Sequence, residues 1–175
     1  VLDQNGLKAM KISEQEAPKN TDFEVKIAVY AAGVNRADVL QRLGNYPPPE
    51  GISSILGLEV AGEIVAIGCQ VQGFKKGDRV MALLPGGGYA QFVVVDYRLL
   101  MPIPKHLDYI QAAGIPEVFL TAYQTLFNLA RLRPKEQVLI HAGASGVGTA
   151  AIQLANIWGA QVSVTVGSDE KARFC

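Results

Sequence analysis

The pattern of hydrophobic and polar residues changes in kind partway along the chain. Up to about residue 104 the apolar residues form short runs, many alternating with polar residues, and glycine- and proline-rich turns separate them. Such runs are typical of strands, which we expect over four segments: residues 23–32, 58–67, 78–84 and 89–95. A short helix capped by Asn35 is expected over residues 36–43. Because no long helix separates the strands, they predict a compact β-barrel-like unit.

After this point the apolar residues recur with the period of a helix. We expect helices over 107–113 and 120–129, then a strand over 138–141, a helix over 146–157, a strand over 161–166 and a further helix from Ser168. A strand–helix–strand unit predicts two parallel strands joined by a right-handed crossover, and therefore an α/β fold. The expected domains are residues 1–116 and residues 117–175. One such unit does not cover both faces of a doubly wound sheet, so we expect the second domain to be incomplete, with strands beyond Cys175.

Composition and charge exclude several classes of function. The chain has 175 residues, 49% of them hydrophobic, and its 16 basic residues balance 16 acidic ones without a basic block. This argues against nucleic acid or an anionic membrane as a partner. No apolar run has the length of a membrane span, no secretory leader is visible, and Cys69 and Cys175 are too few for a disulfide framework. We expect a cytoplasmic protein. Because the chain begins with Val1 rather than Met and ends at Cys175 in the middle of a pattern, we also expect an N-terminal fragment.

The most informative segment is HAGASGVGTAAIQLA, residues 141–155, where a strand enters a glycine-dense turn and a helix follows. A helix N-terminus offers unpaired backbone N–H groups, and glycines let a pyrophosphate approach the backbone without Cβ clashes. The Ser145 hydroxyl can donate to a phosphate oxygen. The spacing G-x-x-G-x-G differs from the standard dinucleotide fingerprint, and a tightly packed turn without a ligand is the alternative. The candidate cofactor-binding residues of the turn are Gly143, Ala144, Ser145, Gly146, Val147 and Gly148. His141, which ends the strand, is expected to be a core residue.

The end of the second strand bears on the choice between NAD and NADP. NAD-binding units commonly place an acidic residue there to hold the ribose hydroxyls, and Gly167 occupies that place here. Ser168 and Lys171 can instead contact a 2′-phosphate, which favours NADPH as the cofactor. Asp169 and Glu170 follow directly and leave NAD open as the alternative.

Several long motifs in order resemble the medium-chain dehydrogenase/reductase superfamily. These are GLEVAGEIVAIG at residues 57–68, GDRV at 77–80 and the glycine turn, which is similar to the quinone oxidoreductase branch. The segments NRADVLQRLGNYPPP, MALLPGGGYAQF and LLMPIP resemble the p53-inducible type within that branch. The resemblance covers essentially the whole chain. It implies a GroES-like β-barrel catalytic domain followed by a Rossmann domain that is truncated here.

The resemblance also predicts a metal-free site. Zinc-dependent members place a cysteine where this chain has Asn35 and a histidine where it has Leu58, directly before Glu59. A catalytic zinc needs thiolate, imidazole or carboxylate ligands, and Asn and Leu supply none of them. We therefore expect no metal, and an acceptor that is already electrophilic, such as a quinone.

Further site residues follow from the resemblance. It implies that Asn35 lies near the nicotinamide and the acceptor and that Thr121 hydrogen-bonds the nicotinamide end. It also implies that Tyr46 lines the acceptor pocket, where it stacks on the acceptor or donates a proton. Helix capping for Asn35 and Thr121, and loop packing for Tyr46, are the alternatives. Arg36 and Asp38 are expected to form a local ion pair.

The leading prediction is an NADPH-dependent quinone reductase that binds a small quinone, active as a complete homodimeric protein. The fragment by itself is expected to be weakly active or inactive. The alternatives are an NADPH-dependent enoyl or acrylate double-bond reductase, or a non-catalytic crystallin-like or RNA-binding role. Charge neutrality and the lack of a basic, aromatic stripe weigh against RNA.

Overall fold

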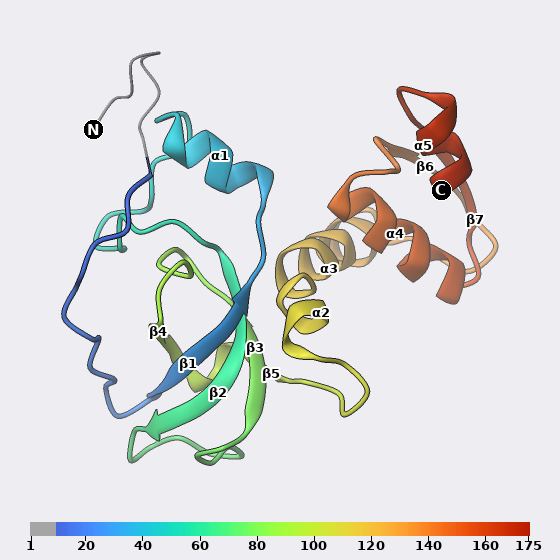
Figure 1. Cartoon of the computed structure of the whole chain (residues 1–175). Coiled ribbons are helices and arrows are strands. Elements are labelled where there is room, and N and C mark those ends of the chain that lie inside the picture. Colours follow the sequence, from blue (N-terminus) through green and yellow to red (C-terminus); the bar gives the residue numbers. More distant parts are fainter. Residues whose placement is uncertain (1–9) are drawn as a thin grey trace. The chain divides into compact units, whose positions relative to one another are not determined.

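The computed structural model describes residues 10–175, which divide into two compact units (Figure 1). The first unit ends at Pro116, and the second comprises Glu117–Cys175. The first is built mainly from antiparallel strands and the second from a strand–helix–strand arrangement. Helices of the length and hydropathy that a bilayer span requires are absent from residues 10–175.

A curled five-stranded antiparallel sheet forms the first unit (Figure 1). Its strands lie in the order β4-β1-β2-β3-β5, so that β4 and β5 are the edge strands. This sheet is the β-barrel-like unit that the sequence predicts. The strands are β1 (Glu24–Ala32), β2 (Glu59–Ile67), β3 (Arg79–Leu83), β4 (Phe92–Asp96) and β5 (Leu100–Pro102).

Both faces of this sheet carry apolar side chains. Alternation along β1 buries Val25 and Ile27 completely, and they pack with side chains of β2, β3 and β4 in one core. On β2 and β3, Ala61 and Met81 instead contact α2 (Tyr109–Ala113). A second short helix, α1 (Arg36–Arg42), follows β1 and leads back toward β2.

Two strand predictions for this unit need correction. The strand expected over residues 89–95 begins only at Phe92, because the backbone N–H groups of Gly88 and Tyr89 bond back to the carbonyls of Gly57 and Leu56. The three-residue strand β5, which follows the short 3₁₀ helix η1 (Tyr97–Leu99), was not expected. It is too short to show an alternating pattern.

The second unit contains two parallel strands, β6 (Gln137–His141) and β7 (Gln161–Thr165), joined by α4 (Gly146–Ile157). The parallel pairing confirms the prediction. The helix expected over 120–129 begins earlier, as α3 (Pro116–Tyr123), and continues into a π-helical segment, η2 (Gln124–Leu129). Proline suits a first helical position because its missing N–H would have no helical acceptor there. The last helix is α5 (Asp169–Phe174).

One face of the two-stranded sheet is covered and the other is open. Val138 and Ile140 of β6 pack with the helices α3 and α4, whereas Leu139 of the same strand is 58% exposed. His141 lies on the open face, with its Nδ1 3.0 Å from Thr165 Oγ1. The expectation that His141 is a core residue is therefore wrong, because only one face of this sheet is packed in the described chain.

Candidate functional site

The turn between β6 and α4 leaves two backbone donors available at the start of a helix. Ser145 is the N-cap of α4, and its Oγ accepts a hydrogen bond of 3.0 Å from the Gly148 N–H. Its carbonyl accepts from the Thr149 N–H over 2.8 Å. The N–H groups of Gly146 and Val147 have no intrahelical acceptor, since they belong to the first turn. With the helix dipole they provide donors for an anion.

The three glycines of this turn are required by packing inside the second unit. A Cβ at Gly143 would lie 2.7 Å from Val164 Cβ, and one at Gly146 would lie 2.9 Å from Val118 Cγ1. A Cβ at Gly148 would collide with the carbonyl oxygen of Ala142. The expected reason for these glycines was access for a pyrophosphate. The structure supplies a different reason, which is the close approach of the strand, the turn and the helices. The role of these glycines toward a cofactor stays a prediction.

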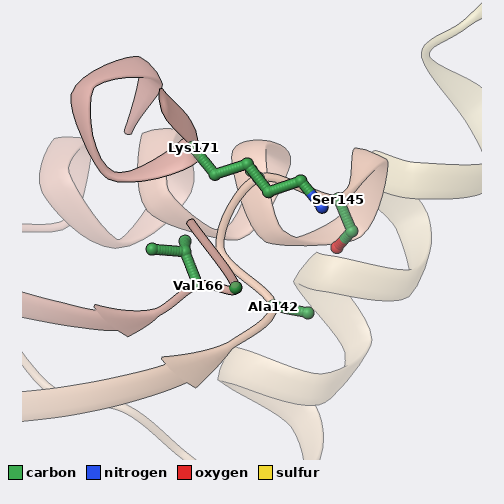
Figure 2. Close-up of a pocket in the computed structure, with 6 residues that line it drawn as sticks. Ala142, Ser145, Val166 and Lys171 are labelled. Atoms are coloured by element: carbon green, nitrogen blue, oxygen red, sulfur yellow. The ribbon is translucent and has the colours of Figure 1, made fainter. Parts of the chain in front are cut away.

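A cavity of about 170 Å³ lies beside the turn, where β6 and β7 end and α4 begins (Figure 2). Figure 2 shows the Lys171 side chain extending from α5 toward Ser145. Ala144, Ser145 and Lys171 were predicted from the sequence, and the structure adds three small or apolar neighbours. The lining residues are Ala142, Ala144, Ser145, Val166, Gly167 and Lys171.

The predicted residues outside this lining have local roles. Ser168 is the N-cap of α5 and accepts a hydrogen bond of 3.3 Å from the Lys171 N–H. Asp169 and Glu170 are exposed in the first turn of α5 and do not line the cavity. Thr121 lies half-buried on α3, where its carbonyl accepts from Thr125 Oγ1 over 2.9 Å. The cavity therefore gathers Ser145 and Lys171, whereas Thr121 lies outside it.

In the first unit, Asn35 is held by two buried carboxylates. Its backbone N–H donates to Asp38 Oδ2 over 2.8 Å, and its side-chain Nδ2 donates to Glu59 Oε1, also over 2.8 Å. Asp38 is 3% exposed and Glu59 is 2% exposed. Because ionised groups are costly to bury without partners, donors of this kind are what such carboxylates need.

Asp38 is the centre of a wider network. Besides the bond from Asn35, it accepts from the Gly57 N–H through Oδ1 and from the Tyr89 hydroxyl through Oδ2, each over 3.0 Å. These partners replace the ion pair with Arg36 that was expected, so that expectation is wrong. Burial, the hydrogen bond to Asp38 and the charges of Asp38 and Glu59 all raise the pKa of Tyr89 well above its ordinary value. The phenol is therefore a neutral donor at physiological pH.

Backbone packing restricts the position of Glu59. Gly33, just after β1, donates its N–H to the Glu59 carbonyl over 3.3 Å, and a Cβ at Gly33 would collide with the Glu59 carboxylate. Sequence reasoning missed the contacts of Gly33 and Tyr89. The available signal was an acidic residue at the beginning of a largely apolar strand, since such a residue needs donors from elsewhere in the fold when it is buried.

Tyr46 lies in the loop that follows α1 and is 49% exposed. It is not one of the residues that hydrogen-bond within the Asn35 network. Its predicted contact with an acceptor stays a prediction.

The chain is similar in sequence and in structure to several known proteins. Residues 21–105 match the family model described as "Alcohol dehydrogenase GroES-like domain". The phenolphthiocerol synthesis polyketide synthase type I Pks15/1 of Mycobacterium marinum is 47% identical over 142 residues, which are 81% of this chain and 6% of that protein. The crystal structure of CurK enoyl reductase matches with a TM-score of 0.83 at 37% identity, over 94% of this chain and 51% of that one.

A quinone oxidoreductase is also among the similar structures. The enzyme from Thermus thermophilus, whose crystal structures include a complex with NADPH, matches with a TM-score of 0.79 at 37% identity. The match covers 92% of this chain and 50% of that one. The chain thus spans about half of each of these two solved enzymes and a small part of the polyketide synthase.

The antiparallel sheet, the parallel strand–helix–strand unit and these matches define the fold of the chain. The chain belongs to the medium-chain dehydrogenase/reductase superfamily, and its residues 21–105 are a GroES-like domain. This confirms the predicted fold class.

The donors at the positions of the zinc ligands do not fit a zinc ion. Leu58 is a buried hydrocarbon, and the Asn35 amide donates to Glu59. Within residues 10–175, no three side chains of His, Cys, Asp or Glu are grouped so as to hold a metal. The donor set of Asn35, Glu59 and Asp38 lacks the thiolate and imidazole ligands typical of catalytic zinc.

Proposed function

We propose that this chain is part of an NADPH-dependent quinone reductase that transfers a hydride without a metal. The observation that carries the proposal is the hydrogen bond from the Asn35 amide to the buried Glu59 carboxylate, with Asn35 at the position where zinc enzymes of the superfamily have a cysteine ligand. A site built on an amide suits an acceptor that needs no Lewis acid, because the ring of a quinone stabilises the negative charge of its reduced product.

The cavity in the second unit supports the choice of cofactor. The N–H groups of Gly146 and Val147, together with Ser145, would hold the diphosphate, and Lys171 and Ser168 would hold the 2′-phosphate. Gly143, Ala144 and Gly148 would shape the turn around it. The bound cofactor supplies the hydride. NADPH rather than NADH is proposed because Lys171 is the only charged residue of the cavity lining.

On the acceptor side, Asn35 would orient the quinone beside the nicotinamide. Tyr46 would stack against the quinone ring, and Thr121 would hydrogen-bond the nicotinamide end. These roles rest on the superfamily resemblance. The contribution of the protein is to position the two reactants and to exclude water, which is a large part of catalysis when the reaction itself needs little acid or base.

The second candidate is an NADPH-dependent reductase of enoyl or acrylate double bonds. The specific observation in its favour is the similarity to CurK enoyl reductase and to a polyketide synthase of Mycobacterium marinum. Such a reaction would use the same cavity and the same kind of cofactor. Membership of the p53-inducible type, a homodimeric state and a cytoplasmic location belong to the first proposal. Against an RNA-binding role stands the zero net charge.

The decisive experiment is a steady-state assay of the complete protein with NADPH and two acceptors, a 1,4-quinone and a 2-enoyl thioester. The proposal expects turnover with the quinone and a kcat/KM at least about tenfold lower with the thioester. NADH in place of NADPH is the cofactor control. Oxidation of NADPH by the thioester alone would establish the second candidate in its place. Size-exclusion chromatography with light scattering tests the homodimer.

A further inference from the structure

Asn35 makes a contact that its place at a helix N-cap does not require. At the helix start, Asp38 Oδ2 accepts from the Asn35 N–H over 2.8 Å, while the Asn35 side chain makes no cap hydrogen bond of its own. Its Nδ2 donates instead to Glu59 in the neighbouring strand.

The chemical nature of Glu59 decides which way round this amide lies. The 2.8 Å bond from Asn35 Nδ2 to Oε1 is the bond that an ionised Glu59 requires, because an ionised carboxylate only accepts hydrogen bonds and repels the Asn35 Oδ1. A bond of 2.8 Å between Nδ2 and Oε1 is of charge-assisted length. Rotation of the amide by half a turn would bring two oxygens together in a partly buried place. Glu59 therefore leaves one orientation of the Asn35 amide.

The carboxylate is itself held. Gly33 bounds it on one side, since any side chain there would collide with it, and β2 carries it at a position that is 2% exposed. Burial of an ionised group at such a position is weak evidence for a role in stability, because well-packed apolar residues often serve as well. The alternative reason is specificity of geometry at Asn35.

We propose that Glu59 is a positioning residue for hydride transfer, which acts by locking the flip state of the Asn35 amide so that the same polar edge always faces the acceptor. The proposal rests on the proposed function, in which Asn35 orients the acceptor. It extends the candidate site by one residue, Glu59, beyond those predicted from the sequence.

The test is a double-mutant cycle in the complete protein with Glu59→Gln and Asn35→Ala. The glutamine variant keeps the shape of Glu59 but pairs with either flip state of the Asn35 amide, so kcat should fall about tenfold or more. The KM for NADPH should stay within about twofold of the native value, and the urea midpoint within about 0.2 M. In the Asn35→Ala background the same substitution should cost nothing further in kcat, because the group it positions is gone. Glu63→Gln, four residues along the same strand and half-buried, is the matched control and should leave kcat unchanged.

Multiplicative losses in kcat, or no loss in Glu59→Gln, would overturn the proposal. If Glu59→Gln does not fold, Glu59→Asp takes its place, because it keeps the charge but ends one methylene short of Asn35. A second readout needs no turnover. In ¹⁵N-labelled native protein the Asn35 Nδ2 proton that bonds Glu59 should be shifted downfield by the charge-assisted hydrogen bond, and this shift should shrink in Glu59→Gln; unchanged shifts would refute the lock. A protein that reduces neither acceptor would disprove the proposed function, and the amide shifts would still decide the role of Glu59.

Discussion

The hydroxyl of Tyr89 donates a hydrogen bond of 3.0 Å to Asp38 Oδ2, although 51 residues separate the two along the chain. Asp38 is at the same time the residue that secures Asn35 at the start of α1. The loop that precedes β4 thus supports the helix next to the candidate acceptor residue. Both residues lie in the first unit, so this support is complete within it.

Removal of the Tyr89 hydroxyl should destabilise the first unit. Tyr89→Phe leaves the buried Asp38 with one donor fewer, and we expect the free energy of unfolding to fall by about 1–3 kcal/mol, as for lost hydrogen bonds to buried charged groups. Urea unfolding measures it. Tyr97→Phe is the control, because Tyr97 packs against the sheet core away from this network. An equal loss of unfolding free energy in both variants would mean that the hydrogen bond from Tyr89 to Asp38 adds no stability of its own.

The same pair predicts a loss of stability at alkaline pH. The pKa of Tyr89 is raised in the folded protein by burial and by Asp38, above the unfolded value of about 10. Above that pH the folded state therefore binds more protons at this group than the unfolded state, and the free energy of unfolding falls as pH rises. Urea titrations between about pH 8 and pH 11 should show a steeper fall for the native protein than for Tyr89→Phe. Parallel curves would contradict the assignment.

Alanine substitutions at Gly148 and Gly167 distinguish a packing role of a glycine from a role in access for the cofactor. Gly148→Ala places a methyl group against the Ala142 carbonyl, so we expect a loss of about 1–3 kcal/mol or more in the free energy of unfolding. Gly167→Ala meets no atom within 4 Å and lines the cavity. It should leave stability within about 0.5 kcal/mol and weaken NADPH binding, measured by isothermal titration calorimetry. Undiminished NADPH affinity in Gly167→Ala would place the cofactor elsewhere.

Lys171 should discriminate between the two nicotinamide cofactors. Lys171→Gln removes the cation of the cavity lining while keeping most of the side-chain length, so the Kd for NADPH should rise about tenfold and that for NADH should change little. Arg173→Ala, an exposed cation of the same helix outside the lining, is the control. Equal effects of Lys171→Gln on both cofactors would show that this lysine does not read the 2′-phosphate.

Two substitutions of Tyr46 distinguish stacking from proton donation. If the ring stacks on the acceptor, Tyr46→Phe should keep kcat within about twofold, whereas Tyr46→Ala should raise the KM for the quinone several-fold. Because Tyr46 is 49% exposed, neither change should lower the free energy of unfolding by more than about 0.5 kcal/mol. A loss of kcat in Tyr46→Phe as large as in Tyr46→Ala would assign the role to the hydroxyl.

Much of the fold was predictable because local patterns coincide with the elements. Alternation predicts β1 and β2 to within a residue or two, and the strand–turn–helix pattern predicts β6, α4 and the parallel β7. The failures have a physical cause. The segment before Phe92 looks like a strand but is bent by backbone bonds to Gly57 and Leu56, which are distant in sequence.

The candidate site was predictable in its members but not in its contacts. Ser145 and Lys171 follow from a helix N-terminus and from a strand end, which are local features. The pairing of Asn35 with Glu59 depends on β1 and β2 being neighbours in the sheet. The sequence suggested a cap or a place near the acceptor for Asn35 and an ion pair for Asp38, but not this contact. A side chain with several possible partners takes the one that the sheet brings close.

By itself the sequence determined where most of the helices and strands lie, that the strands of the second unit are parallel, and which turn offers backbone donors to an anion. These properties depend on interactions within a few residues and on the period of the apolar positions. Only the tertiary structure decided that the turn glycines are demanded by Val164, Val118 and the Ala142 carbonyl, and that Asn35 lies between two buried acids. The physical reason is that a buried polar group must form its hydrogen bonds with groups that lie close to it in space. The folded sheet determines which groups these are, and the order of residues along the chain does not.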